Sequence, residues 1–211
     1  MGYRPQLSTL LGCGLLAGPL FVLSFWLQGL VRPDYDPLRH PVSSLAIGSA
    51  GWVQSLTFLV CGALTVAFAV GLWRLGDSRS GAILVGLIGV GFVGAGLFTT
   101  DPISGYPPGT PDRLTQYTTS GALHQFFSAL FFLGLPIACF VYARHLPRSW
   151  AIYSVVSGVA FFVAFVLAAI GFSQSPALVA YGGLWQRVSI LIGLGWLTAL
   201  AWRVRSTHAA A

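Results

Sequence analysis

The sequence predicts an all-α, polytopic integral membrane protein built as a bundle of six transmembrane helices. Composition is the first observation: only 8% of the 211 residues are charged and 55% are hydrophobic, whereas a soluble domain carries roughly a quarter charged residues. The second is a succession of apolar stretches of about 20 residues, the length that crosses a hydrocarbon core of roughly 30 Å. Together they exclude an ordinary soluble enzyme and a disordered chain.

The apolar stretches run continuously, without the alternation of period two that barrel strands require. They cover residues 9–31, 51–73, 81–99, 120–143, 150–172 and 181–202. We expect the first stretch to be retained as a helix, because it exceeds the apolar region of about 7 to 15 residues in a signal peptide. The six spans leave room for a single membrane domain, residues 1–211, and for no soluble one.

The arginines predict the orientation of the bundle. With six spans both termini lie on one side, and seven of the 11 basic residues would share that side while four lie on the other. An excess of Lys and Arg marks the cytoplasmic side, so both termini are expected there, in a cell (plasma) membrane. The arginines are scattered between apolar runs, which argues against a nucleic-acid partner.

Glycine and proline predict how the helices pack. The third helix carries glycines at positions 81, 86, 89, 91, 94 and 96, and small residues let helices approach closely in lipid. We therefore expect the third helix to be central. Pro136 predicts a kink in the fourth helix, because proline removes a backbone hydrogen bond.

Polar side chains fall at the outer ends of several helices, beside the long outer loops 32–50 and 100–119. Loops of that length are often functional, and ionisable groups within a span mark a site unless they are paired for structural reasons. The candidate catalytic residues are His40, Ser43, Asp101 and His124. The expected ligand-binding residues are Ser44, Gln54, Gln125, Gln186 and Arg187.

The same region carries a resemblance to a known family. The segments His40-Pro41-Val42-Ser43-Ser44-Leu45, Gly51-Trp52-Val53-Gln54, Gly96-Leu97-Phe98 with Asp101-Pro102, and Gly121 to His124 resemble the bacterial and archaeal membrane family called domain of unknown function 998. The resemblance covers nearly all of the six spans. It implies a small multi-pass membrane protein and singles out His40, Ser43, Asp101 and His124, but it supplies no reaction.

Two functional interpretations involve a ligand at this face. In the favoured one, the polar groups line an outward-facing pocket for a membrane lipid or a small amphipathic molecule. The inner halves of the helices lack the polar path that a channel or ion-coupled transporter needs. In the alternative, His40, Asp101 and His124 bind a divalent metal such as zinc and hydrolyse an outer-leaflet lipid whose phosphate or carboxylate Arg187 holds.

Two further interpretations remain. Asp101, Arg187 and His124 could form a hydrogen-bonded ion pair that fastens the loops to the bundle and binds no ligand. Haem ligation by His40 and His124 is disfavoured, because such histidines usually lie within helices and His40 is expected in a loop.

Overall fold

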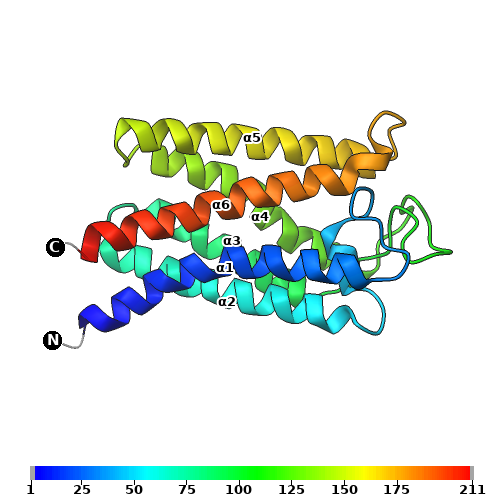
Figure 1. Ribbon diagram of the computed structural model, residues 1–211, viewed down its shortest axis with the longest axis horizontal. Helices are drawn as coiled ribbons and strands as arrows, with labels where there is room; N and C mark the ends of the chain where they lie inside the picture. Colours follow the sequence, from blue (N-terminus) through cyan, green and yellow to red (C-terminus); the bar gives the residue numbers. More distant parts are fainter. Residues whose placement is uncertain (1–2, 210–211) are drawn as a thin grey trace.

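The structure is a computed structural model that describes residues 3–209 and contains six long helices (Figure 1). They are α1 (Tyr3–Val31), α2 (Gly51–Leu75), α3 (Arg79–Leu97), α4 (Thr119–Ala143), α5 (Arg148–Phe172) and α6 (Gly182–Ala209), with two short 3₁₀ helices, η1 (Val42–Ala46) and η2 (Val179–Tyr181). All six long helices are apolar and long enough to cross a membrane, which confirms the predicted fold class. Their bounds agree with the expected spans within a few residues, except that α1 begins earlier and α6 ends later.

Local sequence sets where these helices begin and end. Ser78 and Thr118 are N-caps whose side chains accept hydrogen bonds from the backbone N–H groups of Gly81 and Gly121, as capping residues commonly do. Helix α2 ends at Gly76, whose φ of 82° lies in the left-handed region that glycine adopts without steric cost.

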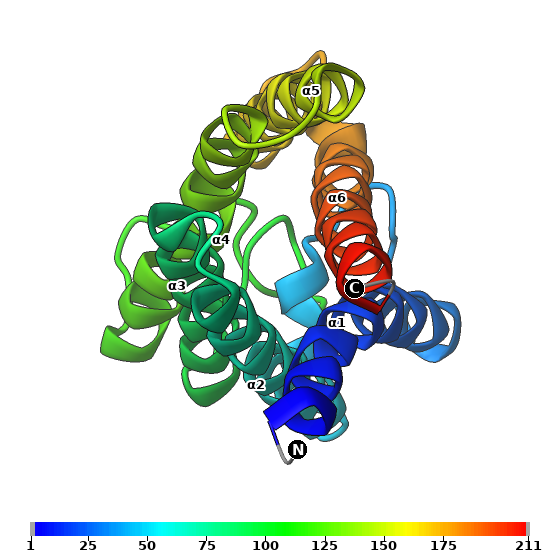
Figure 2. The same cartoon turned by 90° about the vertical axis from the view of Figure 1, so that its left-hand side faces the viewer.

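The six helices form a ring in chain order (Figure 2). Each packs against its neighbours in sequence, and α6 closes the ring against α1. The expectation of a central third helix is wrong, because α3 packs mainly between α2 and α4 as one member of the ring. Helices α4 and α6 face each other with few contacts, and η1 lies inside the outline of the ring at its far end in Figure 2.

The glycines of α3 allow close approach on two sides. A Cβ atom added at Gly89 would lie 2.8 Å from the backbone nitrogen of Val66 in α2, and one added at Gly62 of α2 would lie 2.8 Å from the backbone nitrogen of Val93. On the other side, a Cβ at Gly94 would overlap the Phe127 ring of α4. The glycines therefore allow close packing at the α2–α3 and α3–α4 interfaces, where larger side chains would not fit.

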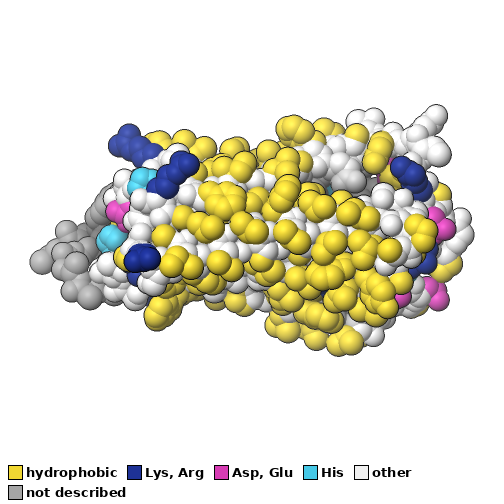
Figure 3. Space-filling view, turned by 90° about the horizontal axis from the view of Figure 1, so that it is seen from above, with side chains coloured by type: hydrophobic (Ala, Val, Ile, Leu, Met, Phe, Trp, Pro, Cys, Tyr) yellow, Lys and Arg dark blue, Asp and Glu magenta, His cyan; other side chains and the backbone are white. Residues whose placement is uncertain are grey.

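The surface is that of a protein surrounded by lipid. Hydrophobic side chains cover the middle of the long axis and charged ones gather at its two ends (Figure 3). Trp52 and Trp202, near opposite ends of the bundle, are 66% and 61% exposed, as is typical of aromatic residues at membrane interfaces. Both termini lie at the same end (Figure 1). Helix α4 continues through Pro136, where the expected kink stays a prediction.

Candidate functional site

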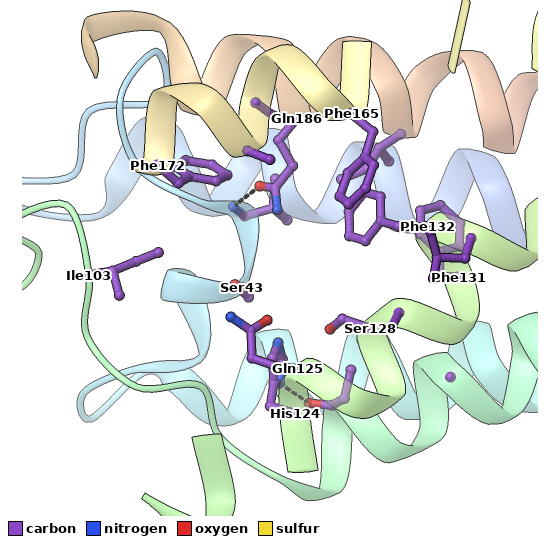
Figure 4. Close-up of a pocket in the computed structure, with 18 of the residues that line it drawn as sticks. Ser43, Ile103, His124, Gln125, Ser128, Phe131, Phe132, Phe165, Phe172 and Gln186 are labelled. Atoms are coloured by element: carbon purple, nitrogen blue, oxygen red, sulfur yellow. Dashed lines mark hydrogen bonds between the residues drawn. The ribbon is translucent and has the colours of Figure 1, made fainter. Parts of the chain in front are cut away.

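A cavity of about 550 Å³ lies inside the ring, toward the end opposite the termini (Figure 4). Helix α4 contributes the largest share of its wall, with further residues from α5, the loop between α3 and α4, α3, α6, η1, α1 and α2. Its volume falls within the roughly 300–1,000 Å³ of small-molecule sites. The weak packing between α4 and α6 leaves this space open.

The cavity wall has an apolar part and a polar part. The apolar part consists largely of aromatic rings, among them Phe21, Phe92, Phe131, Phe132 and Phe165. The Phe132 and Phe165 rings stack with centroids 4.7 Å apart. Polar side chains line the part near the outer loops, namely Ser43, Arg113, Tyr117, His124, Gln125, Ser128, Ser173 and Gln186.

Four of the predicted site residues border this cavity, namely Ser43, His124, Gln125 and Gln186. The other five, His40, Ser44, Gln54, Asp101 and Arg187, do not line it. Gln54 lies between helices, where its side-chain oxygen accepts a hydrogen bond from Gln28 of α1 at 2.8 Å. Ser44 is fully buried.

Gln186 positions the segment that brings Ser43 to the cavity. Its side-chain oxygen accepts a hydrogen bond of 2.7 Å from the backbone N–H of Val42, the first residue of η1. This bond satisfies a backbone donor that has no partner within so short a helix. It joins α6 to η1 directly beside Ser43 (Figure 4).

His124 joins α4 to the end of α3. Its Nδ1 atom lies 2.8 Å from the carbonyl oxygen of Phe98 and 3.1 Å from that of Ala95. The last carbonyls of a helix lack partners within the helix, and the imidazole supplies one here. The ring is 2% exposed and stands nearly perpendicular to Phe58, with centroids 6.0 Å apart.

Asp101 organises the beginning of α4. Its carboxylate accepts hydrogen bonds from the backbone N–H of Thr118 at 2.9 Å and from the Thr118 hydroxyl at 2.6 Å. Thr118 in turn caps α4. The negative charge near a helix N-terminus is favourable, so Asp101 has a structural explanation that needs no ligand.

Arg187 fastens the first outer loop to α6. Its Nη1 atom donates to the carbonyl oxygens of Pro37, His40 and Gly183, and its Nη2 atom donates to the hydroxyl of Tyr35. Burial raises the pKa of Tyr35 to about 12, although the nearby guanidinium acts in the opposite direction. The phenol therefore stays protonated over the physiological pH range, and its hydroxyl donates a hydrogen bond to the carbonyl oxygen of Pro41 at 2.9 Å.

The predicted ion pair of Asp101, Arg187 and His124 is wrong. Each of the three binds a different group, and the partners of Arg187 and His124 are largely backbone carbonyls. Backbone carbonyl oxygens at the ends of loops and helices need hydrogen-bond donors, just as carboxylates do. Such oxygens lie next to Arg187 and His124 and accept their hydrogen bonds.

The predicted metal site is not formed either. Among residues 3–209 no three His, Cys, Asp or Glu side chains are grouped so that they could hold a metal ion. His40 lies in a separate environment, where its Nδ1 accepts the backbone N–H of Asp36 at 2.9 Å and its ring packs on Tyr106 with centroids 5.1 Å apart. Burial lowers the pKa of His40, and this residue stabilises the loop.

The outer loops are joined to one another near the cavity. Arg39 and Asp112 form an ion pair of 2.7 Å, and Arg39 also donates to the carbonyl of Ser104. Gln174, just after α5, donates to the carbonyl of Asp112 at 3.1 Å. Asp112 thus links three outer segments, next to Arg113 in the cavity wall.

The sequence did not single out several lining residues. Ser128 lies one turn beyond His124, so the helical period alone could have indicated it. Arg113 and Leu114 belong to an irregular loop, in which no periodicity indicates the direction of side chains. The Phe rings of the wall look in the sequence like ordinary membrane-facing residues.

Comparison with known proteins gives one match. Searches against curated proteins and against solved structures find no similar chain. The profile of the family described as "protein of unknown function (DUF998)" matches residues 15–203. The match begins within α1 and ends within α6, so it includes every helix of the ring and both long outer loops. The chain is therefore a membrane protein that belongs to the DUF998 family.

Proposed function

We propose that the cavity binds a membrane lipid or another small amphipathic molecule. The observation that carries this proposal is the division of its wall, with aromatic rings in one part and polar groups, most of them uncharged, toward the outer loops. Burying an acyl chain against such rings gains about 25 cal/mol per Å² of apolar surface. Polar groups of the ligand would meet the polar part of the same wall.

The shape of the interior favours binding over passage through the bundle. A separate hollow near Asp77 and Tyr142 measures about 40 Å³. It lies at the end of the ring that carries the termini, and its lining residues are different from those of the large cavity. These features support a pocket with access from the outer end.

Filling the cavity tests this proposal. Ala168 lines the cavity and is 1% exposed, so the ring introduced by Ala168→Phe would occupy the ligand's space. We expect this variant, in lipid nanodiscs, to lose most of its photo-cross-linking to a long-chain fatty alcohol that carries a diazirine. The wild-type cross-links should map by mass spectrometry to cavity-lining segments of α4 and α5.

Ala160→Phe is the matched control, because Ala160 lies on the same helix, is partly buried and does not line the cavity. It should retain wild-type labelling. Equal labelling of wild type and Ala168→Phe, with cross-links scattered over the lipid-facing surface, would contradict a binding site in the cavity.

We propose further that the protein lies in the plasma membrane with its termini and the connections α2–α3 and α4–α5 in the cytoplasm. The arginine distribution supports this orientation. In a variant whose three cysteines are replaced, Thr115→Cys should react with an impermeant maleimide in intact cells, whereas Ser80→Cys should react only after lysis. Both positions are exposed, at opposite ends. The reverse pattern would overturn the orientation.

A further inference from the structure

His124 offers the cavity a hydrogen-bond acceptor. Its Nδ1 atom contacts two backbone carbonyl oxygens, and a carbonyl oxygen only accepts hydrogen bonds, so the hydrogen must reside on Nδ1. In a neutral imidazole the other nitrogen then carries a free lone pair. The position of the proton on His124 is thus set by the end of α3.

The free nitrogen faces the cavity. Figure 4 shows Nδ1 bonded toward α3, while the opposite edge of the ring points into the open space beside Gln125 and toward Ser43. Within residues 3–209, no protein group donates a hydrogen bond to Nε2 of His124. Its lone pair is therefore available to a molecule bound in the cavity.

The surroundings favour the neutral form of this imidazole. No Asp or Glu is among the described residues that line the cavity, and the Asp101 carboxylate is bonded to Thr118. Asp101 acts on His124 through its charge but without a hydrogen bond, so an imidazolium would be buried without a directly bonded counter-charge, which is unfavourable. Arg113 is the charged residue in the described lining, and it lies exposed in the outer loop.

The remaining polar lining is uncharged. Ser43 and Ser128 supply hydroxyls, and Gln125 and Gln186 supply amides. The oxygen of Gln186 is engaged by Val42, which leaves its NH₂ group to donate. Such a lining fits a headgroup that both donates and accepts hydrogen bonds. It favours an uncharged one, because the charged side chain in the described lining, Arg113, lies exposed in the outer loop, where water weakens its attraction for an ionic headgroup.

We infer that the ligand is an uncharged amphiphile whose headgroup donates an O–H or N–H hydrogen bond to Nε2 of His124, as a long-chain alcohol or a monoacylglycerol would. This inference rests on the proposed lipid-binding function and specifies its ligand class. His124 is thereby a specificity-determining residue that selects a donor in the headgroup.

A pair of probes isolates this hydrogen bond. 1-Dodecanol and dodecyl methyl ether each carry a dodecyl chain, but only the alcohol can donate. Each would compete with the diazirine-bearing alcohol for the protein in nanodiscs, with concentrations expressed as mole fraction in the membrane. We expect the wild type to prefer dodecanol about tenfold, the effect of one buried hydrogen bond.

Two substitutions test the roles of Nδ1 and Nε2 of His124 independently. The amide nitrogen of His124→Asn can take the place of Nδ1 and donate to the α3 carbonyls, but nothing replaces Nε2. We expect this variant to lose the preference for the alcohol, so that the two probes compete equally well with each other. The longer His124→Gln places an amide near the position of Nε2 and should recover part of that preference.

The outcomes distinguish a failure of the role inferred for His124 from a failure of the proposed lipid binding. If both probes compete equally well in the wild type, or if His124→Asn keeps the tenfold preference, the cavity binds amphiphiles but the role of His124 is wrong. If neither probe competes, the inference and the lipid-binding function both fail. The wild-type preference is measured without any variant, so a misfolded substitution cannot mask the result.

Discussion

Arg187→Ala should destabilise the protein more than the removal of any other charged side chain. The guanidinium is 2% exposed and donates to three carbonyl oxygens and one hydroxyl. Its removal leaves these acceptors buried without their donor, at about 1–3 kcal/mol for each one that water cannot reach. We expect a loss of at least about 3 kcal/mol in the free energy of unfolding, which corresponds to a Tm lower by roughly 6–12 °C.

Thermal unfolding in detergent measures this effect. Arg205→Ala is the matched control, because Arg205 is an exposed arginine of the same helix, and its Tm should change little. Arg187→Lys should be nearly as unstable as Arg187→Ala, since one ammonium cannot reproduce the planar arrangement of donors. An unchanged Tm for Arg187→Ala would mean that the loop over residues 35–41 is held by other contacts.

Gly62→Leu should have a comparable effect through packing alone. Even a Cβ atom at this position would lie 2.8 Å from the backbone nitrogen of Val93 and 2.9 Å from the carbonyl oxygen of Gly89. These are backbone atoms of α3 and cannot rotate away, so α2 and α3 would have to separate. Overpacking of this kind costs typically 1–3 kcal/mol and occasionally more, and we expect about 3 kcal/mol for leucine.

The comparison is with Gly195→Leu in α6, where nothing lies within 4 Å of an added Cβ and the residue is exposed. That substitution should be neutral or slightly stabilising, because leucine favours a helix over glycine by about 0.5–1 kcal/mol. Equal Tm values for the two variants would show that the α2–α3 interface is looser than the structure indicates.

The helices could be predicted from the sequence because the membrane imposes a simple requirement. A span must be apolar and about 20 residues long, and both properties can be read directly from the chain. The arrangement in a ring could not be predicted in this way. The glycines of α3 indicate close packing equally well for a central helix and for one that approaches two neighbours, and only the positions of α2 and α4 decide between them.

The candidate site could be located but not resolved in detail. His124 and Gln186 were singled out because they are polar within apolar spans, and both border the cavity. Their partners could not be predicted, because these are backbone groups: the carbonyls at the end of α3 and the first N–H of η1. In a sequence, a charged side chain suggests a partner of opposite charge. Every residue has a backbone carbonyl, so the residue types do not indicate which carbonyl oxygen a side chain binds. The grouping of Arg187 with Asp101 failed for that reason.

The ring described above has a consequence for biosynthesis. Since neighbours in the chain are neighbours in space, most helix pairs can assemble as soon as each hairpin enters the bilayer, and such local contacts form quickly. The seam between α1 and α6 is the exception, because it joins the first helix of the nascent chain to the last. The cavity is therefore enclosed only when translation is nearly complete, and until then its aromatic wall faces lipid. A truncated chain that lacks α6 would retain five inserted helices but no enclosed binding chamber.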